Sequence, residues 1–238
     1  MDFFYNILFL AVLFISNVIQ AITGFAGTVI AMPPSIKLIG VDKARVVLNV
    51  MALISCFWIA IRNTKYINFK ELIKIVIFML FGMIIGIKFL SIFPTKILIT
   101  VYGIIIVLIG LKNLFVKKEI KLPKVGMIVV LLLSGVIHGM FVSGGALLVV
   151  YASKELKNKE EFRATISPVW VILNSFLLCN QIQNNMFSKD TIILILVCVI
   201  PLFAAICIGN KIHTKINERS FLKIVYVLLI VSGLIIII

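Results

Sequence analysis

Apolar runs of about 20 residues recur along the whole chain, and they constrain the fold more than any other feature. A helix of about 20 apolar residues crosses the roughly 30 Å hydrocarbon core of a bilayer. Of the 238 residues, 62% are hydrophobic and only 13% are charged. The sequence therefore predicts an all-α membrane protein and excludes a soluble globular domain.

Charged residues gather between the apolar runs rather than within them. The 23 Lys and Arg residues exceed the 9 Asp and Glu residues, which gives a net charge of +14. On a soluble protein this charge would suggest nucleic acid as a partner. Here we interpret the basic residues as topology signals and anchors to lipid headgroups, and we expect no nucleic acid.

No residue cluster in the sequence predicts catalysis or a cofactor. The four cysteines lie in apolar runs without CxxC or metal-ligand spacing, so they are better interpreted as small packing residues. There is also no nucleotide-binding loop and no nucleophile–base pair. We therefore expect no enzyme activity, no cofactor and no metal site.

The apolar runs divide into two similar halves. The polar linker 116–124 lies near the midpoint, and we predict two repeats, 1–118 and 119–238, of four transmembrane helices each. Arg45 and Arg163 start equivalent spans 118 positions apart (163 − 45). Gly82 and Gly86 match Ala205 and Gly209, and close helix packing is the simpler role for these glycines. The predicted spans are 3–22, 46–61, 72–90, 96–115, 125–142, 164–180, 191–209 and 221–238.

The first helix of each half contains a glycine-rich interruption. We name Thr23–Thr28 (TGFAGT) the first break and His138–Gly145 (HGMFVSGG) the second break. A short apolar piece follows each break, and the first piece contains Pro33 and Pro34, which predict a kinked, re-entrant or partly unwound segment. We expect the two breaks to face each other across the middle of the membrane.

Each break could bind an anion. Glycine allows unusual backbone angles, and a helix that starts after a break turns free N–H groups and its positive dipole end toward the cavity. The alternatives are close helix packing for the glycines and a hydrogen bond to a neighbouring helix for the histidine. The candidate substrate-binding residues at the breaks are Thr23, Gly24, Gly27, Thr28, His138, Gly139, Ser143, Gly144 and Gly145.

Four polar residues after the breaks are further candidates. Arg45 and Arg163 could attract an anion, because a guanidinium forks onto carboxylate, phosphate or sulfonate oxygens. Both could instead be interface residues whose charged ends reach the headgroups. Asn49 and Ser167 could contact substrate or join helices to each other.

The acidic residues all lie at a terminus, in loops or at span ends. Carriers coupled to protons or sodium commonly bury Asp or Glu deep in a span. Coupling in this chain would therefore depend on His138, on backbone carbonyls or on a proton carried by the substrate.

The sequence resembles the TauE/SafE sulfite exporter family, also called the TSUP family. The resemblance covers essentially the whole chain and depends on ITGFAGTVIAMPP and IHGMFVSGGALLVV, each followed by a charged turn that ends in arginine. It implies a multi-pass permease of the bacterial inner membrane for sulfite, sulfoacetate or other organosulfonates. The first motif has fewer glycines than the usual family form.

We therefore expect transport of a small sulfur-containing anion by alternating access around the two breaks. A channel-like anion pore and a non-transporting membrane scaffold are the two alternatives. The expected partners are the small anion and the lipid bilayer, with a homodimer as an assembly that such a permease could form.

Overall fold

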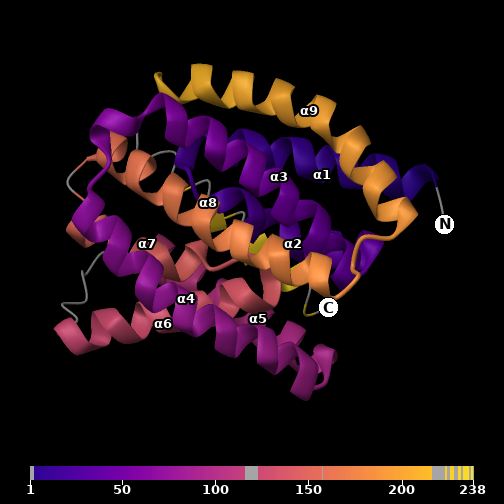
Figure 1. Ribbon diagram of the computed structural model, residues 1–238, viewed down its shortest axis with the longest axis horizontal. Coiled ribbons are helices and arrows are strands. Elements are labelled where there is room, and N and C mark those ends of the chain that lie inside the picture. The colour runs from indigo at the N-terminus through magenta and orange to yellow at the C-terminus, as the bar shows by residue number, and fades with distance from the viewer. Residues whose placement is uncertain are drawn as a thin grey trace.

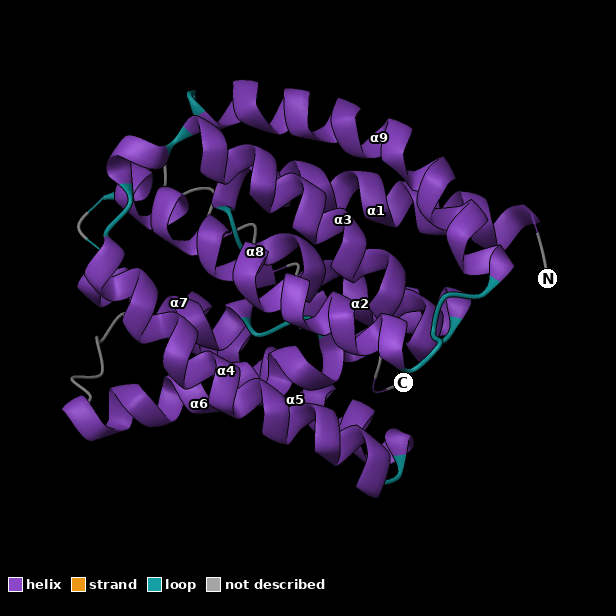
Figure 2. Cartoon of the chain, in the orientation of Figure 1, coloured by secondary structure: helices purple, strands orange, loops and turns teal. Residues whose placement is uncertain are grey.

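The computed structural model describes residues 3–115, 123–156 and 158–215, together with Lys223 and scattered positions from 226 to 237. The predicted boundary between 118 and 119 and most of the predicted last span lie outside these residues. Within the described part every regular element is helical (Figure 2). The elements are α1 (Phe3–Thr23), α2 (Ala26–Ile39), α3 (Val41–Arg62), the 3-10 helix η1 (Thr64–Tyr66), α4 (Phe69–Ile92), α5 (Thr95–Phe115), α6 (Lys124–Phe141), α7 (Gly145–Glu155), α8 (Lys159–Gln183) and α9 (Lys189–His213).

Seven of the described helices are long and apolar enough to cross a bilayer, namely α1, α3, α4, α5, α6, α8 and α9. Large apolar side chains cover their outer faces, and Ile200 on α9 is 78% exposed. Such exposure is expected where the solvent is lipid, and it would be an aggregation hazard in water. The prediction of an all-α membrane protein is therefore confirmed.

Polar side chains set the starts of three spanning helices. Asn68, Asn158 and Ser188 each accept a hydrogen bond from the backbone N–H three residues later, at the beginning of α4, α8 and α9. These bonds satisfy N–H groups that have no partner inside a helix. The chain therefore enters the membrane at positions that local sequence defines.

The predicted interruptions are present, and the chain folds back at each of them. Gly24, with φ 83°, separates α1 from α2, and Val142, with φ 55°, ends α6. A Cβ placed on Gly27 would lie 2.5 Å from Cβ of Gln20 and 2.7 Å from the carbonyl oxygen of Ser16. Helix α2 therefore runs back along α1 instead of continuing its direction.

The segment with two prolines is a re-entrant helix and is not unwound. Pro33 and Pro34 lie inside the continuous helix Ala26–Ile39, whose 14 residues span about 21 Å at about 1.5 Å per residue. This length is less than the roughly 30 Å hydrocarbon core. Gly40, with φ 81°, then turns the chain into α3.

Packing between helices joins the first half of the chain to the second. Helix α1 packs on α9, α4 packs on α6, and α3 packs on α8. In Figure 1 the layer of α9, α1 and α3 lies on one side of α8, and the layer of α4, α5 and α6 lies on the other. The predicted repeat makes α6 the counterpart of α1, and α9 the counterpart of α4. The α1–α9 contact and the α6–α4 contact are then equivalent, one for each half. An internal repeat predicts this pattern, and its exact boundaries stay a prediction.

Close packing explains most of the glycines outside the breaks. A Cβ on Gly82 would lie 2.0 Å from the carbonyl oxygen of Leu132, and one on Gly135 would lie 2.1 Å from that of Met79. Gly209 approaches the carbonyl oxygen of Val18 on α1 in the same way, at 2.6 Å. The packing interpretation of the glycines on α4 and α9 is thus confirmed, because any side chain there would force the helices apart.

Candidate functional site at the two helix breaks

The two breaks lie against each other. The hydroxyl of Ser143 donates to the carbonyl oxygen of Thr28 at 3.1 Å and to that of Phe141 at 2.8 Å. A Cβ on Gly145 would lie 2.7 Å from the carbonyl oxygen of Phe25. The buried hydroxyl of Tyr102 on α5 also reaches the start of α2, at the carbonyl oxygen of Val29. The predicted meeting of the breaks is confirmed, and their role in binding stays a prediction.

The first break satisfies three of its backbone N–H groups through its own side chains, while the N–H of Thr28 makes no hydrogen bond to another described residue. The hydroxyl of Thr23 accepts from the N–H groups of Phe25 at 3.2 Å and Ala26 at 3.1 Å. The side-chain oxygen of Gln20 accepts from the N–H of Gly27 at 2.8 Å, and its nitrogen donates to the carbonyl oxygen of Gly24 at 3.2 Å. The expectation of free N–H groups here is therefore wrong for Ala26 and Gly27. Side chains of α1 accept the hydrogen bonds that an anion was expected to accept.

The second break leaves its backbone open. Gly144 precedes α7 without a capping side chain, and the N–H groups of Gly145, Ala146 and Leu147 make no hydrogen bond to any described residue. The first hydrogen bond of this helix runs from the N–H of Leu148 to the carbonyl oxygen of Gly144, at 3.1 Å. The geometry predicted for an anion site is therefore found at the start of α7.

His138 lies beside this open helix start with no hydrogen bond to its ring. The residue is 1% exposed, and neither ring nitrogen has a partner among the described residues. Its ring centre lies 4.9 Å from that of Trp170 on α8, whose indole N–H also has no partner. Buried polar groups are nearly always hydrogen-bonded, so these two groups in contact stand out from the rest of the helix packing.

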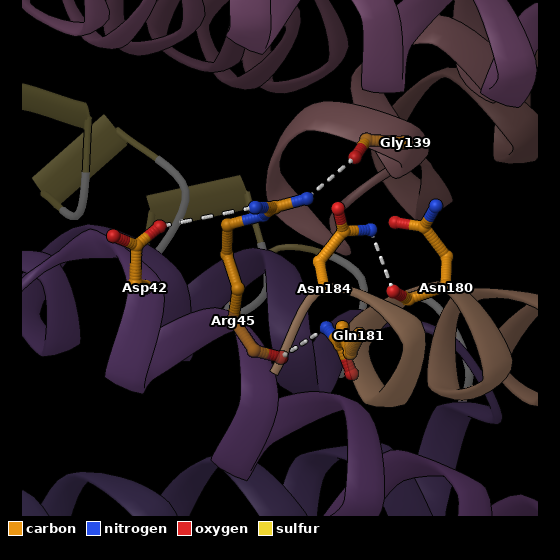
Figure 3. A network of polar contacts seen from close by, with 6 residues as sticks. All are labelled: Asp42, Arg45, Gly139, Asn180, Gln181 and Asn184. Carbon is orange, nitrogen blue, oxygen red and sulfur yellow. Dashed lines mark hydrogen bonds and ion pairs between the residues drawn. The ribbon is translucent and has the colours of Figure 1, made fainter. Parts of the chain in front are cut away.

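Each arginine reaches the break of the opposite half. Arg45 on α3 donates from Nη2 to the carbonyl oxygen of Gly139, in the last turn of α6, at 3.2 Å (Figure 3). Arg163 on α8 lies along Gly24 at the end of α1 and donates to Asn210. Each arginine is only 7% exposed, and Arg45 also lies 4.0 Å from the carboxylate of the exposed Asp42 (Figure 3). A cation at a helix C-terminus is favourable, because unpaired carbonyls point toward it.

Gly139 has a second role beside the acceptor role of its carbonyl. A Cβ on this residue would lie 2.3 Å from the carbonyl oxygen of Met83, so its α-carbon packs on α4. The predicted contact of Gly139 with a ligand is therefore limited to its carbonyl oxygen, and Arg45 holds that atom.

The sequence pattern and this arrangement point to one family. The family model for the sulfite exporter TauE/SafE matches residues 8–236. The chain belongs to the TauE/SafE family. Among curated proteins and among solved structures, none matches the chain. Members of the TauE/SafE family are membrane transporters of sulfur-containing anions and not enzymes, and this member is a multi-pass membrane protein.

Two predicted site residues of this TauE/SafE protein make contacts between or within helices. Asn49 donates to the backbone oxygen of Asn174 at 3.2 Å and to the side-chain oxygen of Gln181 at 3.0 Å, which ties α3 to α8. Gln181 in turn donates to the backbone oxygen of Arg45 (Figure 3). Ser167 donates to the carbonyl oxygen of Arg163 in its own helix at 2.7 Å.

Sequence reasoning missed a polar cavity between α1, α2 and α3. Its volume is about 10 Å³, close to the least space that holds one water molecule. Ser16, Asn17 and Gln20 provide most of its polar wall. Two of these residues could have been found from the offset of 118 that relates the arginines. It makes Ser16 equivalent to Ser134, and Gln20 equivalent to His138. The full lining is Ser16, Asn17, Gln20, Gly27, Thr28, Ala31, Leu48, Met51 and Ala52.

One carboxylate is more buried than the sequence suggested. Glu71 lies at the start of α4, as expected for a span end, yet it is only 7% exposed. The hydroxyl of Tyr151 on α7 donates to this carboxylate, and the Lys74 ammonium lies 3.8 Å from it. The bond from Tyr151 ties the short helix α7 to α4. Among the described residues no three His, Cys, Asp or Glu side chains form a metal-binding group.

Proposed function

We propose that this protein carries small sulfur-containing anions, such as sulfite, sulfoacetate or other organosulfonates, across the bacterial inner membrane. Transport would follow alternating access around the point where the two breaks meet. The observation that carries the proposal is the start of α7, where three successive N–H groups have no partner among the described residues, next to the hydrogen bond that joins the breaks.

The chemistry of the unpartnered groups favours an oxyanion. Backbone N–H groups only donate hydrogen bonds, and the start of a helix adds partial positive charge. A sulfonate or sulfite group offers three oxygen acceptors on one sulfur, so it can meet several donors that converge from different directions. The buried guanidinium groups of Arg45, beside the second break, and Arg163, beside the first, add a positive potential that favours entry of an anion.

The deciding experiment is flux of radiolabelled sulfoacetate and sulfite in proteoliposomes. The proposal predicts saturable uptake, and it predicts that unlabelled substrate inside the vesicles accelerates entry of label by exchange. Flux that does not saturate, with unitary currents, would instead identify an anion pore. Absence of flux of both anions would contradict the proposal and favour the alternative of a non-transporting membrane scaffold.

Two serine variants sharpen the experiment. Ser143→Ala removes a side-chain hydrogen bond that joins the two breaks, so we expect slower transport. Ser167→Ala is the matched control, because its hydroxyl donates within its own helix and makes no hydrogen bond between the breaks. Equal transport by both variants would remove the meeting point of the breaks from the transport path.

A further inference from the structure

His138 occupies in the second half the position that Gln20 occupies in the first. The two residues are 118 positions apart (138 − 20), the same offset that relates the two arginines. The backbone confirms the match. The N–H of Gly24 donates to the carbonyl oxygen of Gln20 at 2.7 Å, and the N–H of Val142 donates to that of His138 at 2.8 Å. Gly24 and Val142 are both left-handed, with φ 83° and 55°.

A glycine also packs on each of these two residues, although Gly27 and Gly144 are 117 positions apart (144 − 27), one fewer than the other pairs. A Cβ on Gly27 would lie 2.5 Å from Cβ of Gln20, and one on Gly144 would lie 2.9 Å from Cβ of His138. Each short helix thus starts against the same position of the preceding helix. The backbone architecture of the two breaks is alike, so a difference between them must come from the side chains.

The side chains treat the two helix starts in opposite ways. Both polar atoms of the Gln20 side chain are hydrogen-bonded. Its oxygen accepts from the N–H of Gly27, and its nitrogen donates to the carbonyl oxygen of Gly24 and to the sulfur of Cys56. Among the described residues neither ring nitrogen of His138 meets the geometry of a hydrogen bond, and the N–H groups of Gly145, Ala146 and Leu147 have no partner. Side chains of the chain itself cap three N–H groups at the first break, and no side chain caps the start of α7 at the second.

Two further polar groups face His138 from α8. Trp170 is 4% exposed, and its indole N–H has no partner within the described residues. The side chain of Asn174 also lies against His138, and its oxygen makes no hydrogen bond to any described residue. An indole nitrogen only donates, so the atom that satisfies it must be an acceptor.

We propose that the transported anion is held by the second break alone, with His138 and the indole N–H of Trp170 donating to oxygens that also meet the first N–H groups of α7. The first break serves as a fixed structural counterpart. This inference rests on the proposed function and extends it to a specificity-determining residue, Trp170. The indole N–H of Trp170 can donate a hydrogen bond to an oxygen of a sulfonate or sulfite, but not to an ammonium group, which has no acceptor.

Conservative tryptophan variants test the inference through transport. Trp170→Phe keeps an aromatic ring beside His138 and removes only the N–H, so the KM for sulfoacetate should rise about tenfold or more, as expected for a lost hydrogen bond to a charged ligand. Trp58→Phe is the matched control, because Trp58 is 36% exposed and lies against Arg62 and Phe203, away from the breaks. Its KM should be unchanged.

A binding readout needs no change to the site. The chain has two tryptophans, so Trp58→Phe leaves Trp170 as the single indole. Titration of this protein with sulfoacetate should change the tryptophan emission saturably, at concentrations that match the transport KM. An unchanged emission at saturating sulfoacetate, in protein that transports it, would overturn the inference.

His138→Gln provides the third test. This variant places in the second half the residue that closes the first half, so the new amide should bond the start of α7 and transport should fall at least tenfold while the protein folds. Wild-type KM values in both Trp170→Phe and His138→Gln would overturn the inference and leave the proposed function standing. Absence of sulfite and sulfoacetate transport by the wild-type protein would remove both.

Discussion

The same substitution at the two equivalent positions should have opposite effects on stability and transport. Gln20→Leu removes the hydrogen bonds to the N–H of Gly27 and the carbonyl oxygen of Gly24 without creating a large cavity. A buried polar group left unsatisfied costs about 1–3 kcal/mol, so two such groups cost about 2–6 kcal/mol. His138→Leu breaks no ring hydrogen bond and removes two unpartnered nitrogens. It loses only the contact with Trp170, worth about 0.5–1.5 kcal/mol.

Thermal unfolding of the purified variants in detergent measures this difference. In a protein of this size 1 kcal/mol shifts the midpoint by about 2–4 °C. Gln20→Leu should therefore lower Tm by roughly 4–24 °C, whereas His138→Leu should lower it by less than about 6 °C. Transport should show the reverse order, because only His138→Leu alters the open break. Equal losses of Tm in the two variants would refute the assignment of a structural and a binding role to the two positions.

The remaining predictions concern packing and charge. Gly135→Ala places a Cβ about 2.1 Å from the carbonyl oxygen of Met79, so it should destabilise the α4–α6 contact by about 1–3 kcal/mol in thermal unfolding, and an unchanged Tm would contradict this packing. Tyr151→Phe leaves the Glu71 carboxylate without its hydroxyl donor and should cost about 1–3 kcal/mol. Glu71→Gln, which keeps an acceptor, should cost less, and the opposite order would refute the bond. Arg45→Ala should lower apparent affinity for sulfoacetate in flux assays because it removes buried positive charge, and an unchanged KM would limit Arg45 to capping α6.

The sequence was sufficient for the membrane class and the positions of the breaks. Both follow from residue types that have one dominant physical meaning, namely long apolar runs and glycines inside them. The arginine pair also indicated the repeat, and the structure places each arginine against the break of the opposite half. That crossed arrangement could not be predicted, because it depends on how α3 and α8 pack.

The direction of the short helices and the difference between the breaks could not be predicted either. An apolar helix that continues and one that folds back have the same periodicity, so Ala26–Ile39 gave no sign of its return along α1. Gln20 drew no attention because a single polar residue in a span is commonly a contact between helices. Its importance depends on the 2.8 Å bond to Gly27, which exists only after the chain has folded back.

A reversible covalent link between the breaks tests the central claim most directly. Thr28→Cys and Ser143→Cys, in a protein whose four native cysteines have been replaced, put a thiol on each of the two residues that the Ser143 hydroxyl and the Thr28 backbone carbonyl now join. We predict that oxidation forms a disulfide and stops sulfoacetate flux in proteoliposomes, and that a reductant restores it. Full flux through the oxidised, cross-linked protein would contradict the claim that the anion passes where the two breaks meet.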